Sequence, residues 1–242
     1  MNTNNNVYTV IYTTVICVLV AAILAFVSQS LKPMQQANEK AETISQILTA
    51  AKFSDKESLA QQSNQDIINL FKSELDHSAL VNAQGQEVKV LGQDEVFSTS
   101  ELKAQNYKFA DSSYESPVYI FKNGVHVFPV YGAGLWGPVW GYIAVDNSLT
   151  HIVGAYFDHA SETPGLGGKI KDDPAFRASF EGKELDLASQ HAFEIVKGGA
   201  PEGKANAIDA ITGATMTSKG LDAAINDWIG AYKNYIQAAE EE

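Results

Sequence analysis

The feature that most constrains this chain is an uncharged apolar stretch close to its beginning. Residues 7–27 contain no Asp, Glu, Lys or Arg and consist mainly of Val, Ile, Leu, Ala and Phe. As a helix, such a stretch is long enough to cross a hydrocarbon core of about 30 Å. A cleaved signal peptide is the alternative, but no basic segment precedes the stretch and no Ala-x-Ala site lies before Lys32. We therefore expect residues 1–32 to form an N-terminal segment and a transmembrane anchor.

Charges near the anchor carry a weak orientation signal. No Lys or Arg precedes the apolar stretch, whereas Lys32 and Lys40 follow it. Because positive residues favour the cytoplasmic side, this distribution alone places the rest of the chain in the cytoplasm. The single cysteine, Cys17, lies inside the stretch and fits an exported domain without disulfides as well as a cytosolic one.

Helical segments are predicted directly after the anchor. Pro33 is expected to punctuate the first helix, and a short amphipathic continuation then carries Ile44, Ile47, Leu48 and Ala51. A second apolar cluster at residues 67–75 indicates another helix. We predict that residues 33–78 form a membrane-proximal helical stalk and that residues 79–242 form one further domain, because no linker or internal repeat divides them.

The further domain combines strand and helix patterns. Residues 118–128 hold two apolar or aromatic runs around Asn123-Gly124, which predicts a tight hairpin turn. Residues 141–145 and 152–157 form a second candidate pair of strands, and residues 88–91 a further strand. We expect an α+β fold with an antiparallel sheet and flanking helices. The C-terminal helix is predicted from apolar residues at spacings of three and four, which are Leu221, Ala224, Ile225, Trp228, Ile229, Tyr232 and Ile236.

Charge and motif spacing argue against several functions. The net charge of -12 opposes binding to nucleic acid, because phosphate backbones are bound by clustered Lys and Arg. His126, His151 and His159 lack the spacing of a zinc motif, so no metal site is expected. Ser161 and Ser218 lack the Gly-x-Ser-x-Gly elbow of serine hydrolases. The residues therefore predict no acid, base or nucleophile as a catalytic group.

Three loops rich in glycine or hydroxyl groups are the candidates for binding. Residues 131–141 contain four glycines, a proline and two tryptophans, and residues 159–169 combine glycines with a carboxylate and an amine. Residues 209–218 place several hydroxyls before the C-terminal helix, whose positive dipole end and free N–H groups favour a phosphate. The structural alternatives are a tight Gly-Pro loop with core tryptophans and a helix start capped by Thr217 or Ser218.

The order of these loops resembles the FMN-binding domain family, and within it the C subunits of sodium-translocating NADH:quinone oxidoreductases. The likeness rests on Gly-Leu-Trp-Gly at 134–137, Glu-Thr-Pro-Gly-Leu-Gly at 162–167 and Thr-Gly-Ala-Thr at 212–215, and it covers most of the chain. It implies an FMN ester-linked to Thr215, with Asp209 and Gly213 needed for recognition by a flavin transferase. The remaining implied cofactor-binding residues are Thr212, Ala214, Thr217, Ser218, Trp136, Glu162, Thr163, Leu166, Gly167 and Lys169.

The resemblance also implies a function and a location. The chain is expected to be an electron-carrier subunit within NADH:quinone oxidation coupled to sodium export, in contact with other membrane subunits and with lipid. It implies a bacterial inner-membrane protein with a single span and its domain on the periplasmic side, against the charge signal. Two alternatives stay open, namely the related flavoprotein subunit of the ferredoxin-NAD electron-transport complex, and a membrane-tethered assembly or sensory module without a redox role.

Overall fold

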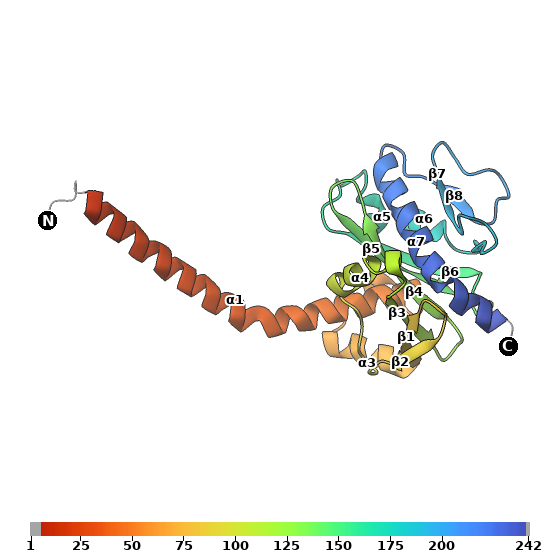
Figure 1. The fold of residues 1–242 in the computed structure, drawn as a ribbon, viewed down its shortest axis with the longest axis horizontal. Helices are drawn as coiled ribbons and strands as arrows, with labels where there is room; N and C mark the ends of the chain where they lie inside the picture. The colour runs from red at the N-terminus through yellow and green to blue at the C-terminus, as the bar shows by residue number, and fades with distance from the viewer. Residues whose placement is uncertain (1–5, 241–242) are drawn as a thin grey trace. The chain divides into compact units, whose positions relative to one another are not determined.

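The computed structural model describes residues 6–240, and the chain divides into two compact units, Met1–Lys40 and Ala41–Glu242. The described part of the first unit is entirely helical and belongs to α1 (Asn6–Ala50), whose last turns lie in the second unit (Figure 1). By length and composition, α1 is able to cross a membrane. Residues 1–5, 241 and 242, which fall in the predicted N-terminal segment and at the end of the predicted domain, lie outside the described residues.

The expected break at Pro33 is wrong, because α1 continues through this residue. A proline inside a helix removes one backbone hydrogen bond and crowds the carbonyl four residues earlier, but the hydrogen bonds of the neighbouring turns remain. The helix therefore lacks one backbone hydrogen bond at Pro33 but continues to Ala50.

The segment expected to be a stalk is part of the compact unit from Ala41 onward. The end of α1, α2 (Lys56–Leu59) and α3 (Asn64–Glu74) precede the first strand, which begins at Leu75. Their apolar residues are buried against one face of the sheet, and they are Ile44, Ile47, Leu48, Leu59, Ile67 and Phe71. A free stalk would leave these side chains in water, so their burial moves the boundary from the predicted residue 79 to residue 41.

A six-stranded sheet forms the centre of this unit, in the order β2-β1-β3-β4-β5-β6, with every neighbouring pair antiparallel. Both predicted hairpins are confirmed, and Gly124 supplies the positive φ of +81° that the first turn requires. The predicted strand at 88–91 is β2, shifted by one residue. The strands are β1 (Leu75–Asn82), β2 (Glu87–Val90), β3 (Glu115–Phe121), β4 (His126–Ala133), β5 (Pro138–Val145) and β6 (Ile152–His159).

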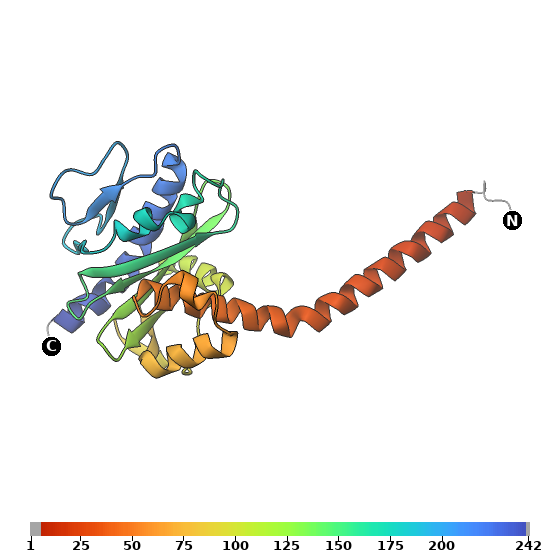
Figure 2. The same ribbon diagram turned by 180° about the vertical axis from the view of Figure 1, so that it is seen from behind.

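Helices cover both faces of the sheet (Figures 1 and 2). On β3, Val118 and Ile120 face the core under α7 (Thr215–Glu240), whereas Tyr119 and Phe121 face the core under residues 41–74. Because successive side chains of a strand point to opposite faces, two covered faces explain why the strands from β3 to β6 are mostly apolar at successive positions.

The face that carries α7 also holds the smaller elements. The predicted apolar stripe of α7 is confirmed, since all seven of its residues are buried. No sequence pattern predicted β7 (Glu194–Val196) and β8 (Ala207–Asp209), which pair in parallel beside α7 and make the unit not wholly antiparallel. The remaining elements are α4 (Thr99–Asn106), the short 3-10 helix Phe109–Asp111, α5 (Lys169–Asp172) and α6 (Pro174–Ala178).

Candidate functional site

The start of α7 is the centre of the candidate site. The helix begins at Thr215, whose side chain is half-buried, after a turn in which Gly213 has a φ of +82°. The first helical bond runs from Ser218 N–H to the Ala214 carbonyl at 2.9 Å. Among the described residues, no side chain accepts from the N–H groups of residues 215–217, so three donors point out of the helix beside the Thr215 hydroxyl.

The predicted caps, Thr217 and Ser218, do not cap the helix. Both lie inside its first turn and are 1 % exposed. The Ser218 hydroxyl accepts a hydrogen bond from Ile211 N–H at 3.1 Å and so closes the loop before the helix. The Thr217 hydroxyl donates to Glu162 Oε2 at 2.6 Å. Their hydroxyls therefore hold the loop in shape, and the other two hydroxyls of this stretch belong to Thr212, which is exposed, and Thr215, which is half-buried.

Glu162 connects three segments that are far apart in the sequence. Its side chain is 4 % exposed. Its Oε1 accepts a hydrogen bond from the Trp136 N–H at 2.8 Å, and its Oε2 accepts one from the Thr217 hydroxyl. Gly167 completes the junction, because a Cβ on it would lie 2.4 Å from Glu162 Oε2 and 2.5 Å from Thr217 Oγ1. Only glycine allows this approach, which brings the loop 162–167 against α7.

The hairpin between β4 and β5 borders the candidate site, together with the start of α7 and the loop 162–167. Gly134 N–H donates to the Gly137 carbonyl at 2.8 Å, and the Ser161 hydroxyl donates to the Trp136 carbonyl at 2.8 Å. Because both backbone groups of Trp136 are held, its ring can stay 66 % exposed on a firmly placed backbone. Leu166 on the neighbouring loop is 43 % exposed and lies next to Gly213, where an added Cβ would come within 3.0 Å of it.

The other predicted residues have more peripheral places. Asp209 ends β8 and accepts the Ala200 N–H at 2.7 Å, and Ala214 is buried under the turn. Thr163 is exposed, and its carbonyl accepts the N–H groups of Leu166 and Gly168. Lys169 begins α5 with a half-buried side chain, and among the described residues its ammonium makes no ion pair. Within residues 6–240, that ammonium lies over no aromatic ring.

Three residues of the site were missed from the sequence. Ser161 fastens the hairpin, Met216 exposes its side chain by 57 % beside Thr215, and Gly220 lets α7 approach β4, because a Cβ there would lie 2.1 Å from the Ala133 carbonyl oxygen. A glycine inside a strongly periodic helix was the signal for Gly220, since glycine weakens a helix unless close packing requires it. Ser161 and Met216 have no comparable signal.

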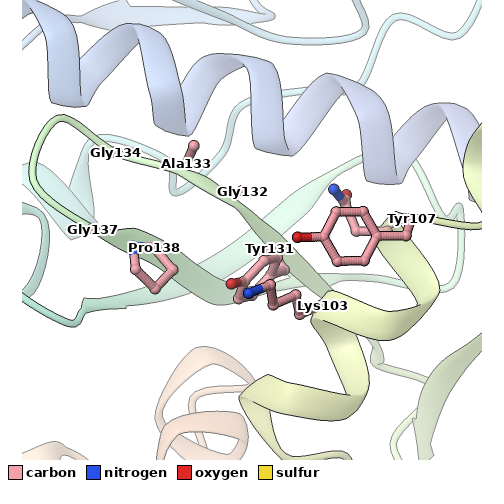
Figure 3. A pocket seen from close by; sticks show the side chains of 9 residues that line it. Lys103, Tyr107, Tyr131, Gly132, Ala133, Gly134, Gly137 and Pro138 are labelled. Carbon is pink, nitrogen blue, oxygen red and sulfur yellow. The ribbon is translucent and has the colours of Figure 1, made fainter.

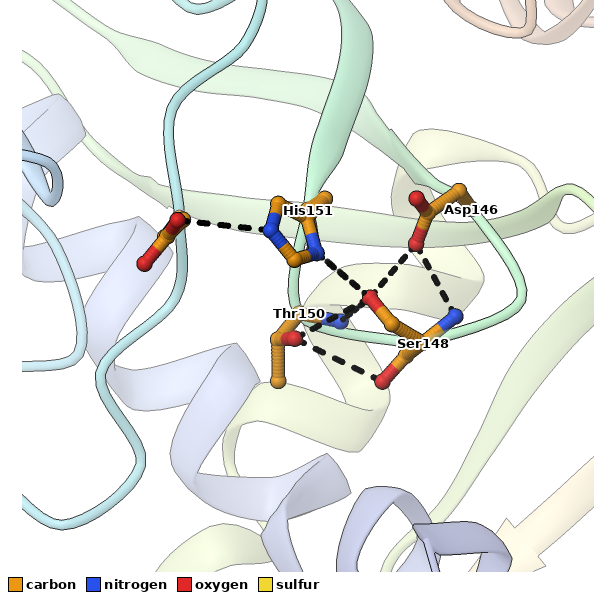
Figure 4. A network of polar contacts seen from close by, with 5 residues as sticks. Asp146, Ser148, Thr150 and His151 are labelled. Atoms are coloured by element: carbon orange, nitrogen blue, oxygen red, sulfur yellow. Dashed lines mark hydrogen bonds and ion pairs between the residues drawn. The ribbon is translucent and has the colours of Figure 1, made fainter.

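A second polar cluster contains a serine, a histidine and a carboxylate, as the active sites of serine hydrolases do (Figure 4). Its hydrogen bonds, however, are those that stabilise a turn. Ser148 Oγ lies 2.8 Å from His151 Nδ1, and His151 Nε2 lies 3.3 Å from Glu184 Oε1. The Ser148 hydroxyl, however, is 2.6 Å from Asp146 Oδ1, to which it donates, and its oxygen accepts N–H groups of Thr150 and His151. The cluster therefore stabilises the exposed turn between β5 and β6 and leaves Ser148 no free proton to give to His151.

The donor set of the first site suits a phosphate attached to a flat apolar body. Outward N–H groups and the positive end of a long helix favour an anion, and the adjacent Thr215 hydroxyl is accessible for ester formation. Exposed Leu135, Trp136, Leu166 and Met216 offer apolar contact nearby. Residues 134–230 match the model of the FMN-binding domain. This part of the chain is therefore similar to the FMN-binding domain family.

The matched segment contains every residue of the predicted cofactor site, from Trp136 to Ser218. The chain is similar to the C subunit of the Na(+)-translocating NADH-quinone reductase of Vibrio campbellii, with 40% identity over 118 residues, which are 47% of this chain and 45% of that protein. The C subunit of the Yersinia pestis enzyme is 42% identical over 106 residues, 43% of this chain and 39% of that protein. The chain thus matches less than half the length of these relatives.

Solved structures extend the likeness beyond residues 134–230. The C subunit of the reductase from Parabacteroides distasonis has a TM-score of 0.70 and 28% identity, and the alignment covers 85% of this chain and 96% of that one. A Shewanella oneidensis NqrC structure has a TM-score of 0.69 at 24% identity, covers 85% of this chain and 100% of that one, and supports the fold. The agreement therefore includes strands and helices that lie before residue 134.

Proposed function

We propose that this chain carries FMN as an ester on Thr215 and serves as an electron-carrier subunit of a membrane complex that couples NADH:quinone oxidation to sodium export. The observation that carries the proposal is the start of α7, where an accessible Thr215 hydroxyl stands beside three outward N–H groups inside an FMN-binding domain. A phosphate bonded to Thr215 Oγ1 lies where both the donors and the helix dipole stabilise its charge.

The neighbouring residues have distinct tasks in this proposal. Gly213, with its positive φ, and the exposed Thr212 leave the loop open to a flavin transferase, with Asp209 as a second recognition residue. Trp136 and Leu166 give the ring of the cofactor apolar walls that limit water. Glu162 acts indirectly, because both of its oxygens are already bonded and it holds the hairpin and α7 in register.

When bound, FMN supplies the one- and two-electron chemistry, so the chain needs no general base or nucleophile of its own. The covalent bond has a physical purpose outside the cytoplasm, where free flavin is scarce. A cofactor held only by noncovalent contacts would be lost there by mass action. Electrons arrive from and leave to other membrane subunits, and the apolar α1 anchors the chain among them and in the lipid.

The function is tested by expressing the full chain with and without a flavin transferase. After denaturing electrophoresis, the band of the co-expressed chain should retain flavin fluorescence, and its intact mass should exceed that of the chain alone by one FMN less one water. The chain expressed alone should carry neither signal. A co-expressed chain that releases all flavin on denaturation would refute covalent attachment.

The location is tested by the topology of the second unit. We expect Ala41–Glu242 on the periplasmic side of the inner membrane, with the N-terminus inside, although Lys32 and Lys40 favour the opposite orientation. External protease added to intact spheroplasts should digest this unit, and a cytoplasmic marker protein should survive as the control. Protection of the unit until the spheroplasts are lysed would reverse the orientation.

A further inference from the structure

A pocket of about 380 Å³ lies beside the β4–β5 hairpin and shares Gly134 and Gly137 with the hairpin wall of the candidate site (Figure 3). Its walls come from the end of α4, which contributes Lys103 and Asn106, from Tyr107 directly after that helix, and from Tyr131 and Pro138 on the two strands. Tyr131 and Pro138 belong to the loop 131–141 that the sequence offered as a candidate for binding, whereas Lys103, Asn106 and Tyr107 were not predicted as part of a site. A concave, mostly apolar pocket of this size with a few polar groups is typical of a small-molecule site.

Three hydrogen-bond donors converge in the pocket. In Figure 3 the hydroxyl of Tyr107, the residue after α4, points into the pocket, and the Lys103 amine lies beside Tyr131. Burial raises the pKa of Tyr131, the Lys103 ammonium partly opposes this, and the Tyr107 phenol adds to it, so the three groups act on one another electrostatically. Lys103 Nζ lies 5.8 Å from the centre of the Tyr107 ring, and within the described chain no carboxylate pairs with it.

The rest of the lining is firmly placed. Asn106 accepts from Trp228 Nε1 at 3.1 Å, and the Tyr131 carbonyl accepts from the same N–H at 2.8 Å, so α7 locks both walls. The backbone at residues 132–134 has little side chain to fill the space, and Gly132 is pressed against Ala224, where a Cβ would come within 2.6 Å. The pocket is therefore preformed and needs no rearrangement to accept a flat molecule.

We propose that this pocket binds a planar aromatic anion of one or two rings, whose carboxylate or phenolate oxygen meets Lys103, Tyr107 and Tyr131. The ring would lie against the Tyr131 and Pro138 walls with Tyr107 at its side. A charged oxygen is preferred over a neutral one because Lys103 brings a positive charge without a carboxylate partner, and charge-assisted hydrogen bonds are about twice as strong as neutral ones.

The test uses the full chain in lipid nanodiscs, expressed without flavin transferase, titrated calorimetrically with 2-naphthoate and with neutral 2-naphthalenemethanol. Empty nanodiscs provide the background. Lys103→Met should lower the affinity for 2-naphthoate at least about tenfold and leave the affinity for the neutral compound little changed, since only the charged contact is lost. Tyr107→Ala should weaken both compounds, and because Tyr107 is 71 % exposed the fold should be kept. Lys108→Met, an exposed lysine outside the pocket, is the matched control.

The outcomes separate this pocket from the flavin site. Thr215→Val should bind 2-naphthoate as the parent chain does, and loading the parent with FMN should leave this binding intact. Absence of saturable binding, or equal affinities for Lys103→Met and Lys108→Met, would overturn the proposal. Loss of binding on loading with FMN would also overturn it, because the pocket would then belong to the tethered cofactor.

Discussion

Thr215→Val should abolish covalent flavin completely while leaving the fold almost unchanged. Valine keeps the β-branched shape and removes only the hydroxyl, which is the single oxygen able to form the proposed ester. The side chain is half-buried and makes no hydrogen bond among the described residues, so the free energy of unfolding should change by less than about 0.5 kcal/mol. Intact-protein mass spectrometry after co-expression with a flavin transferase measures the loss directly.

Two neighbouring threonines make this test specific. Thr212→Val removes an exposed hydroxyl three residues away and should leave the mass of one FMN less one water in place. Thr217→Val removes the bond to Glu162 and should lower the stability of the chain without removing the bonding oxygen. A graded loss of flavin in all three variants would indicate a loop that only cradles phosphate. Retention of the added mass in Thr215→Val would identify a different attachment residue.

Local patterns were sufficient for most of the fold. The Asn123-Gly124 turn and the apolar stripe of α7 are properties of a few adjacent residues, and both were confirmed. The error at residues 33–78 has a different origin. Apolar residues such as Ile47 and Phe71 repeat with a helical period whether the helix is isolated or covers a sheet, so periodicity alone does not reveal the surface that buries them.

The site was predictable from motifs only in part. The short motifs identified the three loops, but the roles of Glu162 and Thr217 depend on a contact across 55 positions of sequence. Thr217 was predicted to cap the helix, which is what its local context favours. Its hydroxyl instead donates a hydrogen bond to the carboxylate of Glu162. The loop 131–141 was a candidate from the sequence, but nothing in the sequence joined it to Lys103, because residues from a helix and a hairpin meet only in the folded chain.

Replacing Glu162 should lower the stability of the site through the loss of two hydrogen bonds. Its carboxylate is buried, and its two oxygens join Trp136 N–H at 2.8 Å and the Thr217 hydroxyl at 2.6 Å. Glu162→Ala would leave two buried or partly buried donors without an acceptor and would open a space beside Gly167. Each unsatisfied donor costs about 1–3 kcal/mol, so a loss of about 2–4 kcal/mol in the free energy of unfolding is expected.

A double-mutant cycle separates the bond itself from general damage. Glu162→Ala, Thr217→Val and the double variant are unfolded with denaturant and followed by tryptophan fluorescence. Because both single variants break the same hydrogen bond, the double variant should be less destabilised than the sum of the two by about 1 kcal/mol or more. Glu162→Gln is the matched control of equal size. Its amide oxygen can still accept from Trp136 while its NH₂ faces Thr217, so it should lose about 1 kcal/mol and keep most of its flavin loading. Strictly additive losses, or a Glu162→Ala variant as stable as the parent, would show that this carboxylate does not hold the hairpin against α7.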